Sequence, residues 1–342
     1  MTPADLSRVV VRALRCAVED GELPAGVAVP ERVVVERTRP GGVGDYASPV
    51  AFGVAKSGGV APRGVAEALA PRLAGLPGID RVEITGAGFL NFVLAAAPVR
   101  EFVRNVRADG ERYGFAPGAP PALDVAMPMP TSAGRSRADV VRLAVLRIEL
   151  SQGREATPGA PGAPGAPGAP GAPVAPVAQR DGDVVAEYGA GAATWAMLCV
   201  PAQETPVFPA SLLVQDESSE FFRVRYARDR ARALTRNARQ LGFDALPGEP
   251  GDGAGALLGA LADHPLVLEA AAHHRAPERL VRQLVVLADA LLDFQYGVLP
   301  KGDEKPSAAH RARLALAEAA GTVLAGGLAL LGIDAPDAPD HL

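Results

Sequence analysis

The sequence predicts an α+β N-terminal domain joined by a Pro/Gly/Ala-rich linker to an all-α helical bundle. Three observations predict this fold class. Strand-like and helix-like patterns alternate in the first part of the chain, the triplet Gly-Ala-Pro recurs five times between Gly159 and Pro173, and the remainder shows helical periodicity almost throughout. The 342 residues suffice for two domains of about 100 to 200 residues each.

The N-terminal elements follow from the spacing of their apolar residues. Residues 5–19 carry apolar side chains at helical intervals, and the β-branched run Val33–Val35 indicates a strand over residues 32–37. The further elements expected are helices over residues 47–56, 62–73 and 98–109, and strands over residues 80–84 and 89–94, which flank a Gly86-Ala87-Gly88 turn. Together these elements predict an α+β domain over residues 1–115.

The Gly-Ala-Pro triplets predict a disordered linker over residues 154–182. Collagen shares the period of three. One short run without charged or hydroxylated partners instead favours a polyproline-type spacer, which would extend over about 45 Å at about 3.1 Å per residue.

Beyond the linker, residues 183–342 show helical periodicity with hardly a strand pattern, which predicts a helical bundle. The helices are expected over residues 184–199, 217–241, 253–263, 265–274, 277–298 and 308–331.

The helix expected over residues 217–241 is unusually rich in arginine. Its spacing gathers one set of residues on a single stripe, namely Arg225, Arg228, Arg232, Arg236 and Arg239. The opposite, packing side is expected to hold Tyr226, Ala227, Leu234, Ala238 and Leu241. The stripe predicts a surface that binds an anionic partner; the alternative is a solvated helix face in an arginine-rich chain.

The composition restricts the possible partners. The formal net charge is −5, so a nucleic acid would have to be held by a local basic surface. Cys16 and Cys199 lie far apart and form no C-x-x-C pair, which predicts reduced cysteines and a cytoplasmic protein. The longest apolar stretch, Ala319–Ile333, is shorter than the roughly 20 residues that span a bilayer, so no membrane segment is expected.

Catalytic patterns are absent from the sequence. No histidine precedes His264, and there is no G-x-S-x-G motif to form a nucleophilic site with the later histidines. The adjacent His273 and His274 would point about 100° apart on a helix and could not chelate one metal ion. Residues 86–91 approximate G-x-G-x-x-G, but they join two strands and end in Asn91. We therefore predict no catalytic residue, no cofactor and no metal.

Several N-terminal motifs resemble the additional N-terminal domain of arginyl-tRNA synthetases. They are Gly44–Ala51, Ala55-Lys56 with Pro62-Arg63 and Ala66-Glu67, Val82–Ile84 and Gly86–Phe92. The resemblance implies contact with the D-loop of tRNA through Phe89 and Asn91, with Tyr46 nearby. Pro49 stands where the family usually has Asn. Core packing is the alternative role for Phe89.

The C-terminal half resembles the anticodon-binding helical domain of the same family. Arg225–Arg230 is similar to the family's Gln-Tyr-Ala-His-Ala-Arg helix, and residues 312–316 and 326–333 are similar to its last helix. Gly191–Trp195 stands where the family has its Asp-Ala-Leu-Arg signature, and the Asp and Arg of that signature are missing. The resemblance implies an anticodon-side RNA site formed by Tyr226, Arg225, Arg228, Arg232 and Arg236, with core packing as the alternative role for Tyr226.

Residues 116–153 resemble a remnant of the entry to the catalytic domain. Met129–Gly134 and the helix expected over residues 139–153 correspond to the loop and helix of the family's ATP site, but the ATP-site histidines are missing. The lysine signature is also missing, because the lysines are Lys56, Lys301 and Lys305 in unrelated contexts. Since removing one preorganised donor costs about 100- to 1000-fold in rate, we expect no ligase activity.

These observations predict a non-catalytic tRNA-binding protein, with arginine tRNA as the first candidate partner. The alternative is a regulatory protein that keeps the fold and pairs with a protein partner such as a true synthetase. A third hypothesis is an active ligase whose catalytic domain comes from another chain.

Overall fold

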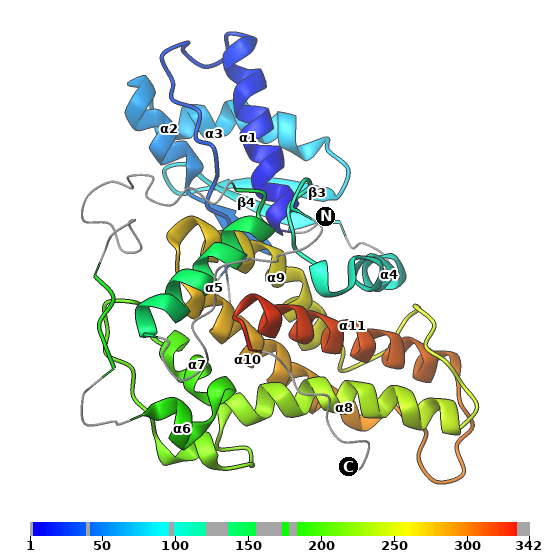
Figure 1. Ribbon diagram of the computed structural model, residues 1–342. Helices are drawn as coiled ribbons and strands as arrows, with labels where there is room; N and C mark the ends of the chain where they lie inside the picture. The colour runs from blue at the N-terminus through cyan, green and yellow to red at the C-terminus, as the bar shows by residue number, and fades with distance from the viewer. Residues whose placement is uncertain are drawn as a thin grey trace. The chain divides into compact units, whose positions relative to one another are not determined.

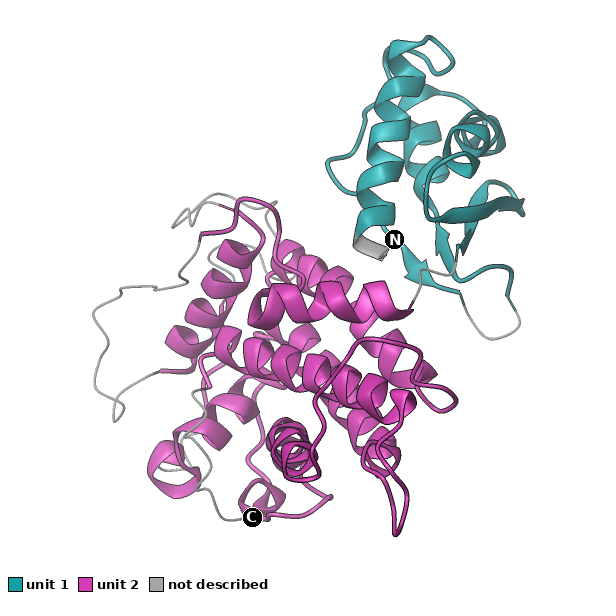
Figure 2. Cartoon of the chain, turned by 90° about the vertical axis from the view of Figure 1, so that its right-hand side faces the viewer, with its two compact units in different colours: residues 1–98 teal, residues 99–342 magenta. Residues whose placement is uncertain are grey.

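The computed structural model describes residues 3–38, 42–95, 99–120, 136–154, 173–177 and 183–333. The chain forms two compact units, Met1–Pro98 and Val99–Leu342 (Figure 2). The first combines helices with a sheet and the second is helical, which confirms the predicted fold class. The division between the units falls at residue 98, however, and not at residue 115 or within the Gly-Ala-Pro segment.

The first unit packs three helices against a small antiparallel sheet (Figure 1). Its elements are α1 (Pro3–Glu19), β1 (Glu36–Arg37), β2 (Tyr46–Ser48), α2 (Val50–Gly58), α3 (Pro62–Ala74), β3 (Ile79–Thr85) and β4 (Phe89–Leu94). The strand order is β1-β2-β4-β3. Helix α3 contacts β3, and both α2 and α3 contact β4, so the helices and the sheet enclose one apolar core.

Two predicted elements of this unit are shorter than expected. The strand expected over residues 32–37 begins only at Glu36, because Val33 bonds to a side chain: the Ser7 hydroxyl donates to the Val33 carbonyl oxygen at 2.8 Å. The helix expected from residue 47 begins at Val50, because Tyr46–Ser48 pairs with β4. In both cases a contact distant in sequence overrides the local pattern.

The hairpin between β3 and β4 has the predicted glycine turn. Gly86 and Gly88 both adopt positive φ, at 55° and 140°. A Cβ atom on Gly88 would lie 2.9 Å from the main-chain oxygen of Pro62, at the start of α3. The turn therefore needs glycine both for its backbone conformation and for its close approach to this helix.

The second unit is a bundle whose elements match most of the predicted helices. They are α4 (Val99–Asp109), η1 (Gly110–Arg112), α5 (Arg137–Ser151), α6 (Val184–Tyr188), α7 (Ala190–Leu198), η4 (Ala210–Leu213), α8 (Glu220–Gln240), α9 (Gly255–His274), α10 (Pro277–Phe294), η5 (Gln295–Gly297) and α11 (Ala308–Leu330). Gly189, at φ 79°, divides one predicted helix into α6 and α7. Conversely, the segments predicted around Pro265 form the single helix α9.

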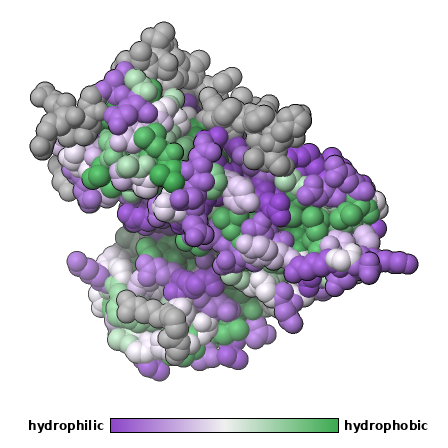
Figure 3. All heavy atoms as spheres, turned by 90° about the horizontal axis from the view of Figure 1, so that it is seen from below, coloured by the Kyte–Doolittle hydropathy of each residue, from purple (hydrophilic) through white to green (hydrophobic). Residues whose placement is uncertain are grey.

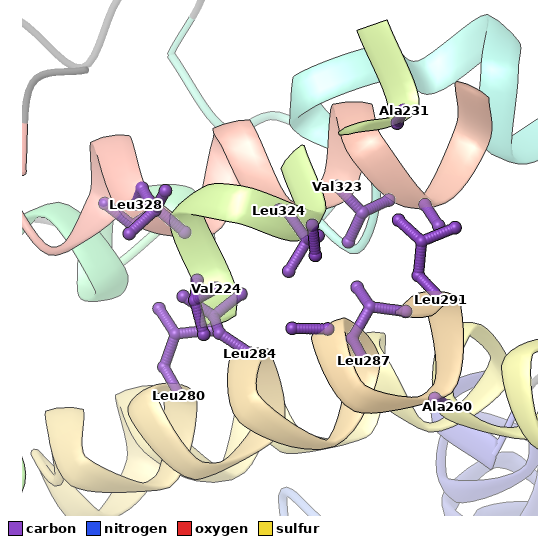
Figure 4. Close-up of a cluster of buried hydrophobic side chains, with 14 of the residues drawn as sticks. Val224, Ala231, Ala260, Leu280, Leu284, Leu287, Leu291, Val323, Leu324 and Leu328 are labelled. Atoms are coloured by element: carbon purple, nitrogen blue, oxygen red, sulfur yellow. The ribbon is translucent and has the colours of Figure 1, made fainter. Parts of the chain in front are cut away.

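Helix α11 lies in the core of this bundle. Figure 4 shows the apolar side chains at its contact with α8 and α10, including Val224, Leu280, Leu284, Leu287, Leu291, Val323, Leu324 and Leu328. By length and composition α11 could cross a membrane, and it is the one such helix among the described residues. Of its most apolar window, however, 72% is buried inside the unit, as in the core helix of a globular domain.

Helices on both sides of the Gly-Ala-Pro repeat belong to this one bundle. Helix α4 contacts α11, and α5 contacts α7 and α9. The segment Pro173–Val177, predicted as linker, lies against the bundle: the Ala175 amide donates to the Ala202 carbonyl oxygen at 2.8 Å. Residues 155–172 and 178–182, with most of the repeat, lie outside the described residues, as does Met129–Gly134. The described segments on both sides of the repeat therefore belong to the second unit.

One buried guanidinium links these segments. Arg137, in the first turn of α5, is 3% exposed and donates hydrogen bonds to main-chain carbonyl oxygens. Its acceptors belong to Ala175, Met197, Val200, Pro201, Ala202 and Glu204, at 2.6 to 3.5 Å. Burial lowers the pKa of Arg137, while the nearby carboxylates of Glu204 and Glu278 oppose this change. Arginine remains charged under such conditions, so the carbonyl oxygens compensate a buried positive charge.

Replacing Arg137 with Met should destabilise the helical unit by about 3 kcal/mol or more, since each buried carbonyl left without a donor costs about 1 to 3 kcal/mol. Urea unfolding followed by circular dichroism would measure this change. The matched control is Arg142→Met on the same helix, because the Arg142 side chain is 60% exposed and its pair with Asp139 should contribute at most about 1 kcal/mol. Equal unfolding midpoints for the two variants would contradict the prediction.

A buried histidine gives the second unit a sensitivity to acid. His264 of α9 is 2% exposed, stacks on Tyr113 with ring centroids 6.1 Å apart, and has no hydrogen-bond partner for Nδ1 within the described chain. Burial lowers its pKa to about 4. In the unfolded chain this histidine protonates with the ordinary pKa of about 6.5. The stabilising effect of the neutral, buried imidazole is therefore complete above that pH and is lost as the pH falls towards 4.

The free energy of unfolding should therefore fall by about 3 kcal/mol between about pH 6.5 and pH 4 on account of His264. A His264→Leu variant removes this titration but keeps an apolar side chain of similar size. Chemical denaturation at several pH values should give a shallower pH dependence for the variant than for the wild type. Parallel pH profiles for the two proteins would refute the assignment.

Candidate nucleic-acid interface

Helix α8 carries most of the predicted site. The Ser219 hydroxyl accepts a hydrogen bond from the Phe222 amide and caps its N-terminus. Its inward positions are apolar, with Val224, Ala227 and Leu234 at most 1% exposed. The opposite surface is solvent-facing, and the outward Arg232, Arg236 and Arg239 are exposed. The predicted division into a packed and an exposed face thus holds for these residues, whereas Leu241, expected on the packing side, is 51% exposed.

The structure corrects the prediction that Arg228, on the arginine stripe, contacts RNA. It is 1% exposed, and its guanidinium bonds Asp229 Oδ1 at 2.6 Å. The helical positions of Val224, Arg228 and Ala231 form one row that faces the bundle, so Arg228 occupies the inner edge of the stripe. Arg228 is therefore a buried structural residue.

Arg225 also deviates from a simple exposed stripe. Its side chain is half-buried, and its guanidinium lies over the ring of Phe221, 5.5 Å from the ring centroid. This cation–π contact holds Arg225 against the helix while part of it stays accessible.

Tyr226, expected on the packing side of α8, is exposed to 39%. Its ring stacks on Phe222 with an interplanar angle of 15° and centroids 5.5 Å apart. Two links to the neighbouring α10 segment flank it: Arg223 Nε pairs with Asp289 at 2.7 Å, and Arg230 Nε donates to Gln295 Oε1 at 2.6 Å. The core-packing alternative is thus wrong for Tyr226, which presents a supported aromatic ring at the surface.

In the first unit, the three predicted RNA residues lie in different environments. Phe89 is 43% exposed at the start of β4 and packs on Phe52, with ring centroids 4.9 Å apart. Asn91 is buried, and its amide donates to Thr85 Oγ1 at 2.8 Å within the hairpin. Tyr46 is buried too, and its hydroxyl accepts from Arg37 Nη2 at 3.2 Å. Buried Asn91 and Tyr46 thus correct the prediction of direct contact, and Phe89 alone of the three offers a large exposed surface.

The second unit also contains a groove of about 550 Å³ between α4, η1, α8 and α11. Its basic lining residues are Arg107, Arg232, Arg236 and Arg239, and its acidic ones are Glu111 and Glu318. Arg107 was missed at the sequence level, although Arg100, Arg104 and Arg107 of α4 repeat at helical spacing. The face of the molecule in Figure 3 mixes hydrophilic areas with hydrophobic patches. A guanidinium-rich groove suits an anionic ligand. The exposed ring of Tyr226, elsewhere on α8, suits a planar group.

The described residues offer little for nucleophilic or metal chemistry. They contain no group of three or more metal-ligating side chains. Burial raises the pKa of the Cys199 thiol to about 12, so this cysteine stays protonated at neutral pH.

Comparisons with known proteins match one domain family in each unit. Residues 6–94 match the domain family described as "Arginyl tRNA synthetase N terminal domain", and residues 224–338 match the "DALR anticodon binding domain". The predicted relationship to arginyl-tRNA synthetases is thus confirmed for these two segments.

Individual relatives match a smaller part of the chain. An arginine–tRNA ligase of Frankia alni is 53% identical over 116 residues, which cover 34% of this chain and 21% of the ligase. The arginine–tRNA ligase of Micrococcus luteus is 43% identical over 117 residues, which cover 33% of this chain and 21% of that ligase. The chain thus spans about a fifth of the length of these curated relatives.

A solved structure matches at the level of the fold. The arginyl-tRNA synthetase of Thermus thermophilus has a TM-score of 0.63 at 14% identity, over 98% of this chain and 100% of that chain.

Residues 95–223 lie between the two matched segments. Their described parts, which are 99–120, 136–154, 173–177 and 183–223, contain helices and loops but no strand. A doubly wound nucleotide-binding fold requires a parallel sheet. These parts therefore do not form such a domain.

Proposed function

We propose that this chain is a non-catalytic tRNA-binding protein, which binds the anticodon arm with its helical unit and the D-loop with its N-terminal unit. The observation that carries the proposal is the match to an anticodon-binding domain over α8, together with the exposed, supported ring of Tyr226 on that helix. Arginine tRNA is the first candidate ligand, in line with the family of both domains. Such a ligand would place the protein in the cytoplasm.

The chemistry of α8 suits an unpaired RNA loop. Sequence-specific recognition of RNA favours splayed single-stranded bases that stack on aromatic rings or guanidinium planes. Tyr226 offers such a ring, backed by Phe222 and held between two links to the α10 segment. Arg232 and Arg236 lie about two and three turns further along the same helix and carry positive charge for the backbone of the loop.

The first unit contributes Phe89 to this proposal. Its ring is partly exposed at the glycine hairpin and rests on Phe52. A D-loop base could stack on the exposed face of this ring without rearrangement of the hairpin, which Asn91 stabilises from inside.

A second candidate function is a regulatory protein that keeps the fold and pairs with a protein partner, such as a true synthetase. Burial of Arg228, Asn91 and Tyr46 favours it, because these residues were expected to touch RNA. The net charge of −5 favours it as well. Failure of both heparin retention and a tRNA gel shift at low salt would put this function first.

The isolated protein should show neither ATP–pyrophosphate exchange nor arginylation of tRNA. No histidine precedes His264 and the lysine signature is missing, so preorganised donors for the phosphates of ATP are lacking. Both reactions would be measured with arginine and tRNA present, beside a no-protein control and an active ligase as positive control. Exchange above the no-protein control would overturn the non-catalytic part of the proposal.

Replacing Tyr226 with Leu should weaken tRNA binding by about 1 to 3 kcal/mol and leave its salt dependence intact, because stacking on a base releases no ions. Titrations at several salt concentrations would measure both quantities, with thermal melts to monitor folding. Leu241→Ala serves as control, since Leu241 is 51% exposed at the C-terminal end of the same helix. Equal loss of affinity in both variants, or loss of stability without a binding defect, would argue against a stacking role.

A further inference from the structure

Two of the helices that line the groove of the second unit carry rows of arginines with the same spacing. On α4 the row consists of Arg100, Arg104 and Arg107, and on α8 it consists of Arg232, Arg236 and Arg239. In each row the intervals of four and three residues keep the side chains on one face of the helix. Arg107 and the whole α8 row line the groove itself.

The floor of the groove is formed by small side chains. Ala231 from α8 and Gly321, Thr322 and Ala325 from α11 line it between the rows. At Gly321 the helices approach so closely that an added Cβ would overlap the Ala231 methyl group. Small side chains therefore line the groove between the arginines, and Glu111 and Glu318 are its longer lining residues that are not basic.

The charges of the groove are arranged to leave it positive. Glu318 Oε2 pairs with Arg107 at 2.8 Å, and its Oε1 accepts from the Thr235 hydroxyl at 2.9 Å, so this carboxylate is engaged and holds Arg107 over the groove. On the other side, Arg239 is 3.9 Å from Asp244, with both side chains largely exposed, so this pair is weak. The four lining arginines exceed the two lining glutamates in charge.

From this geometry we infer that the groove holds the backbone phosphates of the bound RNA, with α4 as a second RNA-binding arm. The inference rests on the proposed function and adds to it, since α4 lies outside both matched domain segments. Each row extends over about 10 Å of helix, which is longer than one phosphate group and suits consecutive phosphates of a strand. The guanidinium fork matches phosphate oxygens in bidentate geometry.

Titration of tRNA at several salt concentrations tests the inference with Arg107→Gln, Arg236→Gln and the exposed Arg104→Gln. Each lost phosphate contact should lower the slope of log K against log salt by about 0.7. The drop in affinity between about 50 and about 200 mM salt should then be about threefold smaller for each variant. Arg279→Gln is the matched control, because Arg279 is an exposed arginine of α10 that does not line the groove.

The variants also separate this inference from the proposed function. Wild-type slopes in the Arg104, Arg107 and Arg236 variants, with tRNA binding retained and weakened by Tyr226→Leu, would overturn the inference while the proposed function stands. Absence of tRNA binding by the wild type at low salt would overturn both. If inorganic tripolyphosphate or polyglutamate binds the groove and tRNA affinity is unchanged in its presence, the groove serves another anion and the inference is wrong. Should Arg107→Gln unfold, shown by its thermal melt, Arg104→Gln and Arg236→Gln decide the outcome.

Discussion

The organisation of the helical unit depends on one buried side chain, Arg137. A guanidinium in the interior needs its donors satisfied and its charge compensated, and here main-chain oxygens from two separate segments meet both needs. These segments are Pro173–Val177 and the loop that follows α7. By bonding both, Arg137 joins α5, which precedes the Gly-Ala-Pro repeat, to the helices that follow it. The described segments on both sides of the repeat consequently belong to one folded body.

Helix α11 imposes the second constraint, through three glycines that face different neighbours. Added Cβ atoms at Gly321, Gly326 and Gly327 would overlap Ala231 of α8, Glu111 of η1 and Leu284 of α10, respectively. Close packing on three sides fixes the positions of α8 and η1 relative to each other. The arginines on α4 and α8 therefore border a common groove because of residues that carry no charge at all.

Most helices could be predicted from the sequence, because their periodicity is a local property. The strand at Tyr46–Ser48 could not, since it depends on pairing with β4, far along the chain. The orientation of α8 was predicted only in part, because its spacing separates two faces but does not show where the core ends. Arg228, expected at the surface, is buried, and Tyr226, expected on the packing side, is exposed. The position of Arg107 in the groove could not be predicted, because the groove exists only after α4 packs on α11. The contacts of Arg137 could not be predicted either, because nothing in the repeat indicates that this side chain binds residues beyond it.

Since Arg137 binds only carbonyl oxygens, its contribution to holding residues 200–204 does not depend on their side chains. The side chain that holds this loop belongs to α5, some sixty positions earlier in the chain. Substitutions at residues 200–204 that respect the backbone conformation and keep the packed Ala202 should thus be nearly neutral for folding, whereas replacement of Arg137 should be strongly destabilising. The surface formed by residues 200–204 is in this sense free to diverge between related proteins, and a new binding sequence could be introduced there while the bundle beneath stays unchanged.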